Sequence, residues 1–197
     1  GLSGRRYVLN VATFEHKKAQ DVLIDAFALV ATRDPDVRLV LVGRATPWLE
    51  EIRQRAASLG LAHRVHFFDD VPHYQVLTFL THASVFCLPS RAEGHPVAIL
   101  EAAALGIPIV STPVGGIAQT IPDESHGLLV PVADVPALAD AVCRLLADPE
   151  LARALGRNLQ RLVRSEFTGL QSAQRDTDLA RELRWSGITR DPEQGRG

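Results

Sequence analysis

The sequence contains no methionine, and its basic residues are almost all arginine. Of its 21 basic residues only two are lysines, the adjacent Lys17 and Lys18. The lack of methionine even at the first position indicates a fragment or a processed product. In a chain that otherwise uses arginine, a lysine pair suggests a phosphate contact, because a compact ammonium group suits a phosphate oxygen. The alternative is a solvated helix end.

Cysteine is also scarce, and long apolar runs and a strong net charge are missing. Cys87 and Cys143 lie in apolar surroundings without metal-ligand spacing, which predicts buried free thiols in a reducing, cytoplasmic compartment. No apolar run has membrane-spanning length and no signal peptide opens the chain, so we expect no direct membrane insertion. The net charge of −2 argues against a nucleic-acid partner.

What the 197 residues do contain is a regular alternation of short β-rich runs and amphipathic helices. This pattern predicts an α/β fold with a doubly wound, parallel, six-stranded Rossmann-like sheet. The expected strands are 7–12, 37–43, 64–68, 84–89, 107–112 and 127–131. The expected helices are 19–33, 46–60, 73–83 and 97–106, then one capped by Asp134 and one from Asp148 to about Ser165.

Ligands of such sheets bind beyond the carboxyl ends of the strands, which directs attention to the loops there. One carboxylate stands alone in the apolar region that follows the fourth strand. Between Gly94 and Pro122, Glu101 is the only charged side chain. Since an unpaired buried carboxylate costs several kcal/mol, Glu101 needs either an arginine partner or ligand hydroxyls such as a ribose diol. Glu93 lies before the predicted helix 97–106 that contains Glu101. It is either a ligand contact or a solvated charge in the loop.

Two glycine-containing loops are further candidates. Gly94, His95 and Pro96 lead into the predicted helix. Glycine permits close approach of a ligand, and the free N–H groups of a helix start form an anion site. The alternative is an ordinary loop-to-helix turn. Gly115 and Gly116 offer a second close approach, although paired glycines are also common in turns.

These motifs lie in a stretch that resembles the nucleotide-sugar-binding signature of retaining glycosyltransferases of family 4, which have the GT-B fold. The stretch reads LPSRAEGHPVAILEAAALGIPIVSTPVGG, with the pattern P-S, E-G-x-P, L-E-A, G-x-P and T-x-x-G-G. The segment LNVATFEHKKAQDVLIDAF resembles the first strand, loop and helix of the family. The resemblance implies that residues 1–185 form a nucleotide-sugar-binding Rossmann-like domain, one half of a GT-B fold. Residues 186–197 are polar, and we expect a disordered tail.

The resemblance also implies roles for the candidate residues. Glu93 and Lys18 would be the catalytic residues, with Glu93 near the reacting centre of the sugar and Lys18 on the diphosphate. Glu101 would hold the ribose hydroxyls. The other substrate-binding residues would be Gly94, His95, Pro96, Val97, Val71, Thr13, Gly115 and Gly116, with Val71 against the base.

The chain departs from the family pattern at several positions. The family usually has an arginine at Thr13, so one positive charge for the diphosphate is missing. Ala19 and Asp70 stand where glycine is usual, and Gln119 stands where glutamate is usual.

The function that the resemblance implies is that of a hexosyltransferase-class glycosyltransferase, with only its donor-binding half in this chain. This half would bind a nucleotide-diphosphate sugar, and an absent N-terminal domain would bring a carbohydrate or lipid-linked acceptor and any peripheral membrane attachment. We expect transfer to a hydroxyl with retention, without a cofactor or metal. The alternatives are a non-catalytic nucleotide-diphosphate-binding module, or a phosphorylation receiver using Asp69 and Asp70.

Overall fold

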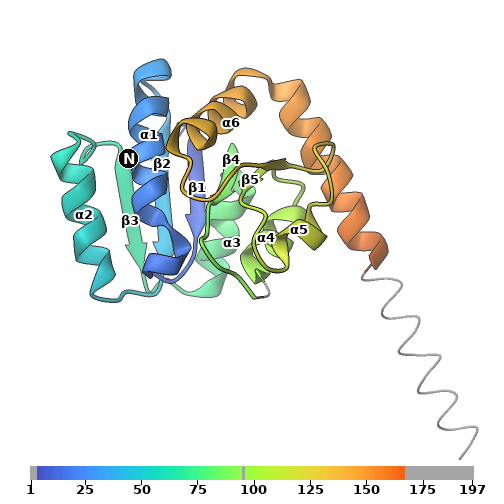
Figure 1. Ribbon diagram of the computed structural model, residues 1–197, viewed down its shortest axis with the longest axis horizontal. Helices are drawn as coiled ribbons and strands as arrows, with labels where there is room; N and C mark the ends of the chain where they lie inside the picture. Colours follow the sequence, from blue (N-terminus) through green and yellow to red (C-terminus); the bar gives the residue numbers. More distant parts are fainter. Residues whose placement is uncertain (1–3, 95, 167–197) are drawn as a thin grey trace, which may run out of the picture.

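The computed structural model describes residues 4–94 and 96–166. Its centre is a six-stranded sheet with the order β3-β2-β1-β4-β5-β6 (Figure 1), in which every neighbouring pair is parallel. The strands are β1 Tyr7–Val11, β2 Arg38–Gly43, β3 Val65–Asp69, β4 Val85–Leu88, β5 Ile109–Ser111 and β6 Leu128–Leu129. The predicted doubly wound parallel sheet is confirmed, and the later strands are shorter than the sequence pattern indicated.

Helices connect the strands where the sequence predicted them, and the short α5 is an additional one. They are α1 Gln20–Arg33, α2 Trp48–Ser58, α3 His73–His82, α4 Val97–Ala104, α5 Ile117–Thr120 and α6 Val135–Ala147. A further helix covers 149–166, up to the last described residue. The predicted caps form: the Asp134 carboxylate accepts the N–H of Ala137 at 2.9 Å, and that of Asp148 accepts the N–H of Leu151 at 2.9 Å. The predicted tail 186–197, the domain boundary at 185 and His95 lie outside the described residues.

The strand side chains divide between two cores, one on each face of the sheet. Alternate residues of β2 enter different cores, with Leu39 and Leu41 on one face and Val40 and Val42 on the other. The first face is covered by α1, α2 and α6, and the second by α3, α4 and α5, while the helix over 149–166 contributes residues to both cores (Figure 1). Burial on both faces explains why the strands are nearly continuous apolar runs rather than alternating ones.

The strand order reverses beside β1. This strand lies between β2 and β4, so the chain first builds the sheet in one direction and then returns to extend it in the other. The connections after β1 and β4 therefore lead to opposite faces, and at such a reversal a ligand crevice is expected at the carboxyl edge. This topology selects the loops 12–19 and 89–96 as the place to look for a binding site.

Two of the departures from the family pattern have a backbone explanation. Ala19, at the start of α1, has φ +54°, and Asp70, after β3, has φ +51°. Both angles lie in the left-handed region, where glycine is free of the steric cost that other residues carry. The usual glycines therefore suit the loop geometry, and this chain keeps that geometry without them.

Asp70→Gly should be less destabilising than the same change at Asp36. Both aspartates are exposed, but only Asp70 has a positive φ. Glycine costs about 0.5–1 kcal/mol in chain entropy at either site, whereas relief of the left-handed conformation returns about 1–2 kcal/mol at Asp70 alone. Urea denaturation should therefore show Asp70→Gly to be the more stable variant by about 1–2 kcal/mol. Equal free energies of unfolding would contradict this account.

Candidate functional site

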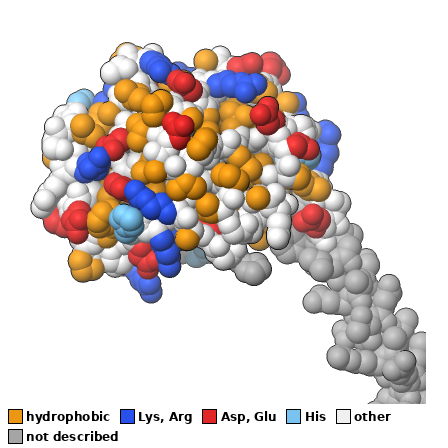
Figure 2. Space-filling view, viewed as in Figure 1, with side chains coloured by type: hydrophobic (Ala, Val, Ile, Leu, Met, Phe, Trp, Pro, Cys, Tyr) orange, Lys and Arg blue, Asp and Glu red, His pale blue; other side chains and the backbone are white. Residues whose placement is uncertain are grey.

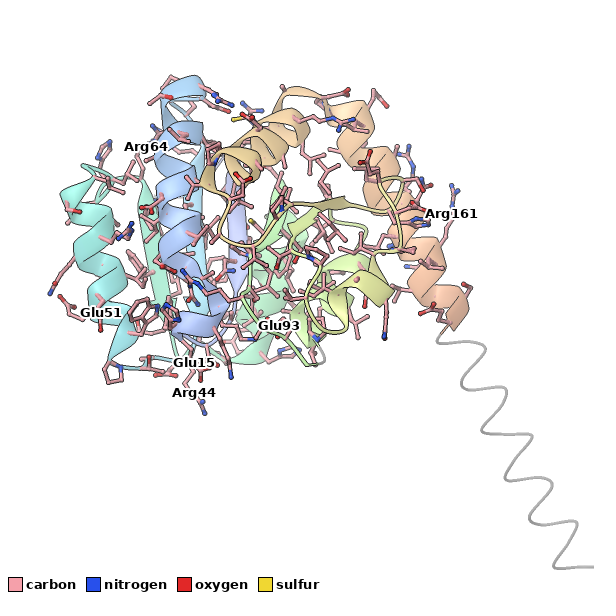
Figure 3. The ribbon with its side chains drawn as sticks, viewed as in Figure 1. Glu15, Arg44, Glu51, Arg64, Glu93 and Arg161 are labelled. Carbon is pink, nitrogen blue, oxygen red and sulfur yellow. The ribbon has the colours of Figure 1, made fainter. Side chains whose placement is uncertain are left out.

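An ion pair joins the two loops at the strand reversal. Lys18 ends the short 3-10 turn His16–Lys18 after β1, and Glu93 lies in the loop after β4. The Nζ atom of Lys18 lies 2.7 Å from both carboxylate oxygens of Glu93. The Glu93 side chain is only 4% exposed and that of Lys18 is 18% exposed. The two residues predicted to be catalytic are thus in direct contact, at the carboxyl edge where Glu93 is labelled in Figure 3.

Neighbouring polar groups orient the Glu93 carboxylate. The hydroxyl of Ser90 donates to Oε1 of Glu93 at 2.6 Å, and Ser90 is fully buried. The hydroxyl of Thr112, which directly follows β5, donates to the carbonyl of Ser90 at 2.6 Å. Groups that follow β1, β4 and β5 therefore position the carboxylate before any ligand binds. Ser90 and Thr112 belong to the P-S and T-x-x-G-G elements of the quoted signature, but the sequence did not indicate that they orient Glu93.

The glycine pair after β5 packs against the Glu93 loop. Gly115 has φ +53°, and a Cβ atom there would lie 1.9 Å from the carbonyl oxygen of Glu93. Gly116 donates its N–H to the carbonyl of Gly94 at 3.2 Å. In the structure the close approach at Gly115 and Gly116 is thus to the backbone of residues 93 and 94. Their predicted contact with a ligand stays a prediction.

The start of α4 is open. An ideal Cβ atom at Gly94 would meet no other atom within 4 Å. Pro96 precedes α4 without a side-chain hydrogen bond to cap the helix, and Val97 is exposed. Among the described residues no side chain caps the first N–H groups of α4, which with the positive end of its dipole favour an anion.

Glu101 lies on α4 and faces the loop after β3. Its Oε1 lies 3.4 Å from Nε2 of His73, at the start of α3. The carboxylate is 24% exposed, so it is less buried than the apolar helix suggested. Within the part of the chain that the structure describes, no arginine pairs with Glu101. Val71, the residue predicted to lie against a base, packs on the same side of the sheet as α4.

Hydrogen bonds from α1 and from the loop after β4 hold the loop 12–19 in place. Thr13 accepts a hydrogen bond through its carbonyl from the Gln20 side chain at 3.0 Å. Arg91 donates from its backbone to the carbonyl of Lys17 at 2.8 Å and forms a bidentate pair with Asp21 at 2.7 and 2.9 Å. Burial opposes ionisation of Asp21, but the hydrogen bonds from Arg91 outweigh it, and the pKa of Asp21 is lowered. The sequence did not indicate a role for Arg91, because its partners are distant in the chain.

Other surface features do not add to this site. Within residues 4–94 and 96–166 there is no group of three or more His, Cys, Asp or Glu that could hold a metal ion, and no helix that is long and apolar enough to cross a membrane. On the face in Figure 2 the basic and acidic side chains are interspersed rather than gathered by sign.

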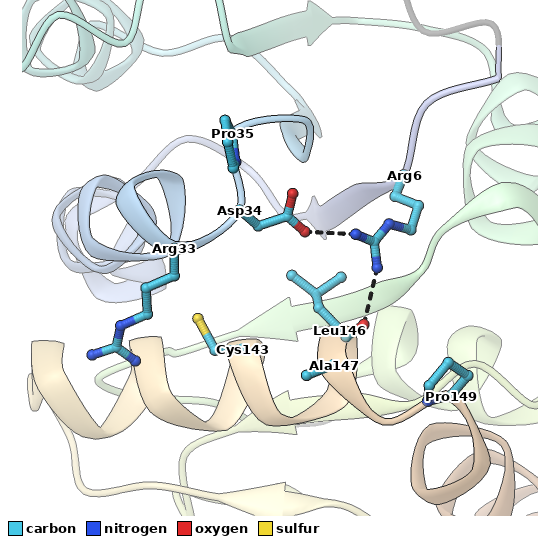
Figure 4. A pocket seen from close by; sticks show the side chains of 8 residues that line it. All are labelled: Arg6, Arg33, Asp34, Pro35, Cys143, Leu146, Ala147 and Pro149. Carbon is cyan, nitrogen blue, oxygen red and sulfur yellow. Dashed lines mark hydrogen bonds and ion pairs between the residues drawn. The ribbon is translucent and has the colours of Figure 1, made fainter.

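A hollow of about 680 Å³ lies at the opposite end of the sheet (Figure 4). It is lined by helix ends and by Arg6, which bridges Asp34 at 2.8 Å and the carbonyl of Leu146 at 2.9 Å. Cys143 lines this hollow and is partly exposed, so the expectation of a buried thiol is wrong for it. That expectation is confirmed for Cys87, whose thiol pKa is raised by burial.

Comparisons with known proteins agree with this geometry. The family described as "Glycosyl transferases group 1" matches residues 2–162. A GDP-mannose-dependent alpha-(1-6)-phosphatidylinositol monomannoside mannosyltransferase of Mycolicibacterium smegmatis is 36% identical over 163 residues, which cover 79% of this chain and 42% of that protein. A lipopolysaccharide core mannosyltransferase of Rhizobium meliloti is 31% identical over 80% of this chain and 46% of that protein. The chain thus spans less than half the length of these two relatives.

Solved structures give the same fold. Sucrose-phosphate synthase from Thermosynechococcus elongatus has a TM-score of 0.77 and 33% identity, over 93% of this chain and 46% of that one. The C-terminal domain of a group 1 glycosyl transferase from Francisella tularensis has a TM-score of 0.76 and 22% identity, over 83% of this chain and 87% of that one. The match to an isolated C-terminal domain covers most of both chains, which places the fold with the C-terminal half of the two-domain architecture.

Gly115→Ala should destabilise the protein, and Gly94→Ala should not. The added methyl group at Gly115 would collide with the Glu93 carbonyl at a positive φ, which costs about 2–4 kcal/mol in packing and backbone strain. At Gly94 the space is open and φ is not positive, so the expected change is below about 0.5 kcal/mol. Thermal or urea denaturation of both variants measures the difference. Equal losses would show that residues 93 and 94 do not restrict residue 115.

Proposed function

Because the chain belongs to the group 1 glycosyltransferases, family 4, and has the fold of the C-terminal domain of the GT-B architecture, we propose that it binds a nucleotide-diphosphate sugar. The observation that carries this proposal is the meeting of Lys18, Glu93 and the open start of α4 in the crevice at the strand reversal. Family membership also removes the phosphorylation-receiver alternative.

In this proposal the diphosphate lies between Lys18 and the first N–H groups of α4. An ammonium group and a helix N-terminus both favour negative charge, and both are fixed in place before binding. As the bond from the sugar to the diphosphate breaks, the leaving nucleoside diphosphate gains negative charge, which these groups would stabilise. We assign no metal ion to this role, because Lys18 and the N–H groups of α4 would stabilise the charge.

Lys18 can serve a diphosphate only if it shares or exchanges its present partner. Both Glu93 oxygens contact Nζ of Lys18, but Oε1 also accepts the hydroxyl of Ser90. If Lys18 turns to a phosphate oxygen, Glu93 therefore keeps one hydrogen bond. The freed Oε2 is then available to a sugar hydroxyl, which suits the predicted position of Glu93 near the reacting centre.

Glu101 would hold the ribose. Its Oε1 lies 3.4 Å from Nε2 of His73, and the described residues form no hydrogen bond to its carboxylate. The two carboxylate oxygens can therefore accept two hydroxyls of a diol. The neighbouring loop after β3, which contains Val71, would then face the base.

The whole enzyme would transfer a hexosyl group to a hydroxyl with retention at the anomeric carbon. The acceptor would be a carbohydrate or lipid-linked molecule held by the other half of a GT-B enzyme. A second candidate function is a nucleotide-diphosphate-binding module without catalysis. Thr13 favours it, because this uncharged residue stands where the family's cation for the diphosphate is usual.

Glu101→Ala should weaken binding of both a nucleoside diphosphate and its nucleoside, since both carry the ribose. The loss of hydrogen bonds to a charged acceptor amounts to about 1.5–3 kcal/mol, or roughly tenfold to a hundredfold in affinity. Calorimetric titration with GDP, UDP, guanosine and uridine measures this loss. Glu124→Ala, which removes an exposed carboxylate elsewhere, is the matched control. Unchanged affinity in a folded Glu101→Ala protein would refute the ribose assignment.

The 197-residue chain alone should bind the nucleotide sugar but transfer almost nothing. Transfer requires an acceptor hydroxyl within about 3–3.5 Å of the anomeric carbon in a site that excludes water. The donor-binding half alone would leave the sugar open to solvent and would hold no acceptor. A panel of nucleotide sugars and acceptors tests this, with a full-length group 1 enzyme as positive control. Transfer near 1 s⁻¹, on the order of ordinary enzymes, would show that the acceptor site lies within this chain.

A further inference from the structure

One basic side chain at the carboxyl edge has no carboxylate partner within the part of the chain that the structure describes. The ion pairs at this edge are Lys17–Glu15 at 2.9 Å, Lys18–Glu93 at 2.7 Å and Arg91–Asp21 at 2.7 Å. Arg44 is exposed, and among the described residues its side chain forms neither a hydrogen bond nor an ion pair. Arg44 therefore carries a positive charge that no neighbouring carboxylate neutralises by direct contact.

The fold places Arg44 beside the loop after β1. It directly follows β2, the strand paired with β1, and adjacent strands lie about 4.8 Å apart. The carbonyl of Arg44 accepts the N–H of Phe14 at 3.1 Å, which is one residue past Thr13. Gly43 approaches this loop so closely that a Cβ atom there would lie 1.8 Å from the carbonyl oxygen of Ala12. The backbone of Arg44 thus lies against the loop, while its side chain is exposed.

Arg44 and Lys18 act on the same carboxylate. The pKa of Glu15 is lowered, first by its hydrogen bond from Lys17 and then by the charges of Lys17, Lys18 and Arg44. Figure 3 shows Glu15 and Arg44 close together at the carboxyl edge. Of these three cations near Glu15, Lys17 and Lys18 each have a carboxylate partner, whereas Arg44 has none among the described residues.

We propose that Arg44 is a further binding residue for the diphosphate of the nucleotide sugar, and that it supplies from β2 the positive charge that Thr13 lacks. A guanidinium can donate two parallel N–H groups to phosphate oxygens, and such charge-assisted bonds are stronger than neutral ones. Arg44 has no partner to give up, whereas Lys18 must leave or share Glu93. The inference rests on the proposed function, since it assigns another contact in the same site.

The test is calorimetric titration of the 197-residue chain and its variants with GDP, UDP and the two nucleosides. Arg44→Ala should weaken binding of the diphosphate about tenfold, as expected for one charge-assisted hydrogen bond, and leave nucleoside binding unchanged. Thr13→Arg in the Arg44→Ala background should restore most of the lost affinity. Arg161→Ala is the matched control, because Arg161 is also exposed and lies away from this edge on the helix over 149–166 (Figure 3).

The outcomes separate this inference from the function on which it rests. If the wild-type chain binds a diphosphate and Arg44→Ala binds it as tightly as Arg161→Ala does, the role of Arg44 is refuted and the binding function stands. A loss that is equal for diphosphate and nucleoside also refutes the phosphate contact. If the wild-type chain binds neither GDP nor UDP, the proposed function and this inference fail together. Unchanged melting temperatures would show that the loss is not one of folding.

Discussion

The ion pair between Lys18 and Glu93 connects the two halves of the sheet where the strand order reverses. Glu93 is almost completely buried, and a buried charge without a partner is strongly destabilising. The loops after β1 and β4 must therefore keep a spacing that preserves the contact. Ser90, Thr112 and the glycine pair after β5 add constraints on the same loop, so the geometry of the crevice is fixed largely by the need to satisfy this one carboxylate.

This arrangement also limits how a ligand can bind. Water is already excluded from most of the Glu93 side chain, so electrostatic interactions there are stronger than at the open surface. A diphosphate that pairs with Lys18 would interact more strongly in that environment, but it must replace the ion pair between Lys18 and Glu93. The open start of α4 carries no such cost, because its N–H groups have no side-chain cap to displace. Binding is thus expected to depend on the helix start and the unpaired cation for its initial attraction.

Much of the fold could be predicted from the sequence, because apolar runs and helical periodicity are local signals. The site was only partly predictable. Glu101 stands out as a lone charge, and Lys18 stands out in an arginine-rich chain. Arg91 and Arg44 carry no such local signal, since their importance comes from strands that are adjacent in space. The sequence predicted a close approach at Gly115 and Gly116, but their packing against the Glu93 loop is a tertiary contact that the sequence cannot show.

Those tertiary contacts also bear on how a departure from a family pattern should be interpreted. Ala19 and Asp70 keep the left-handed backbone that glycine usually provides, so the loop shape does not depend on the usual residue. A backbone angle is a local property, whereas a charged side chain on a neighbouring strand can contact the same ligand. The loops after β1 and β2 are joined by the hydrogen bond from Phe14 to Arg44, which makes them one continuous surface at the carboxyl edge. The loss of a cation at Thr13 therefore has to be weighed against the charges of that whole surface, rather than against position 13 alone.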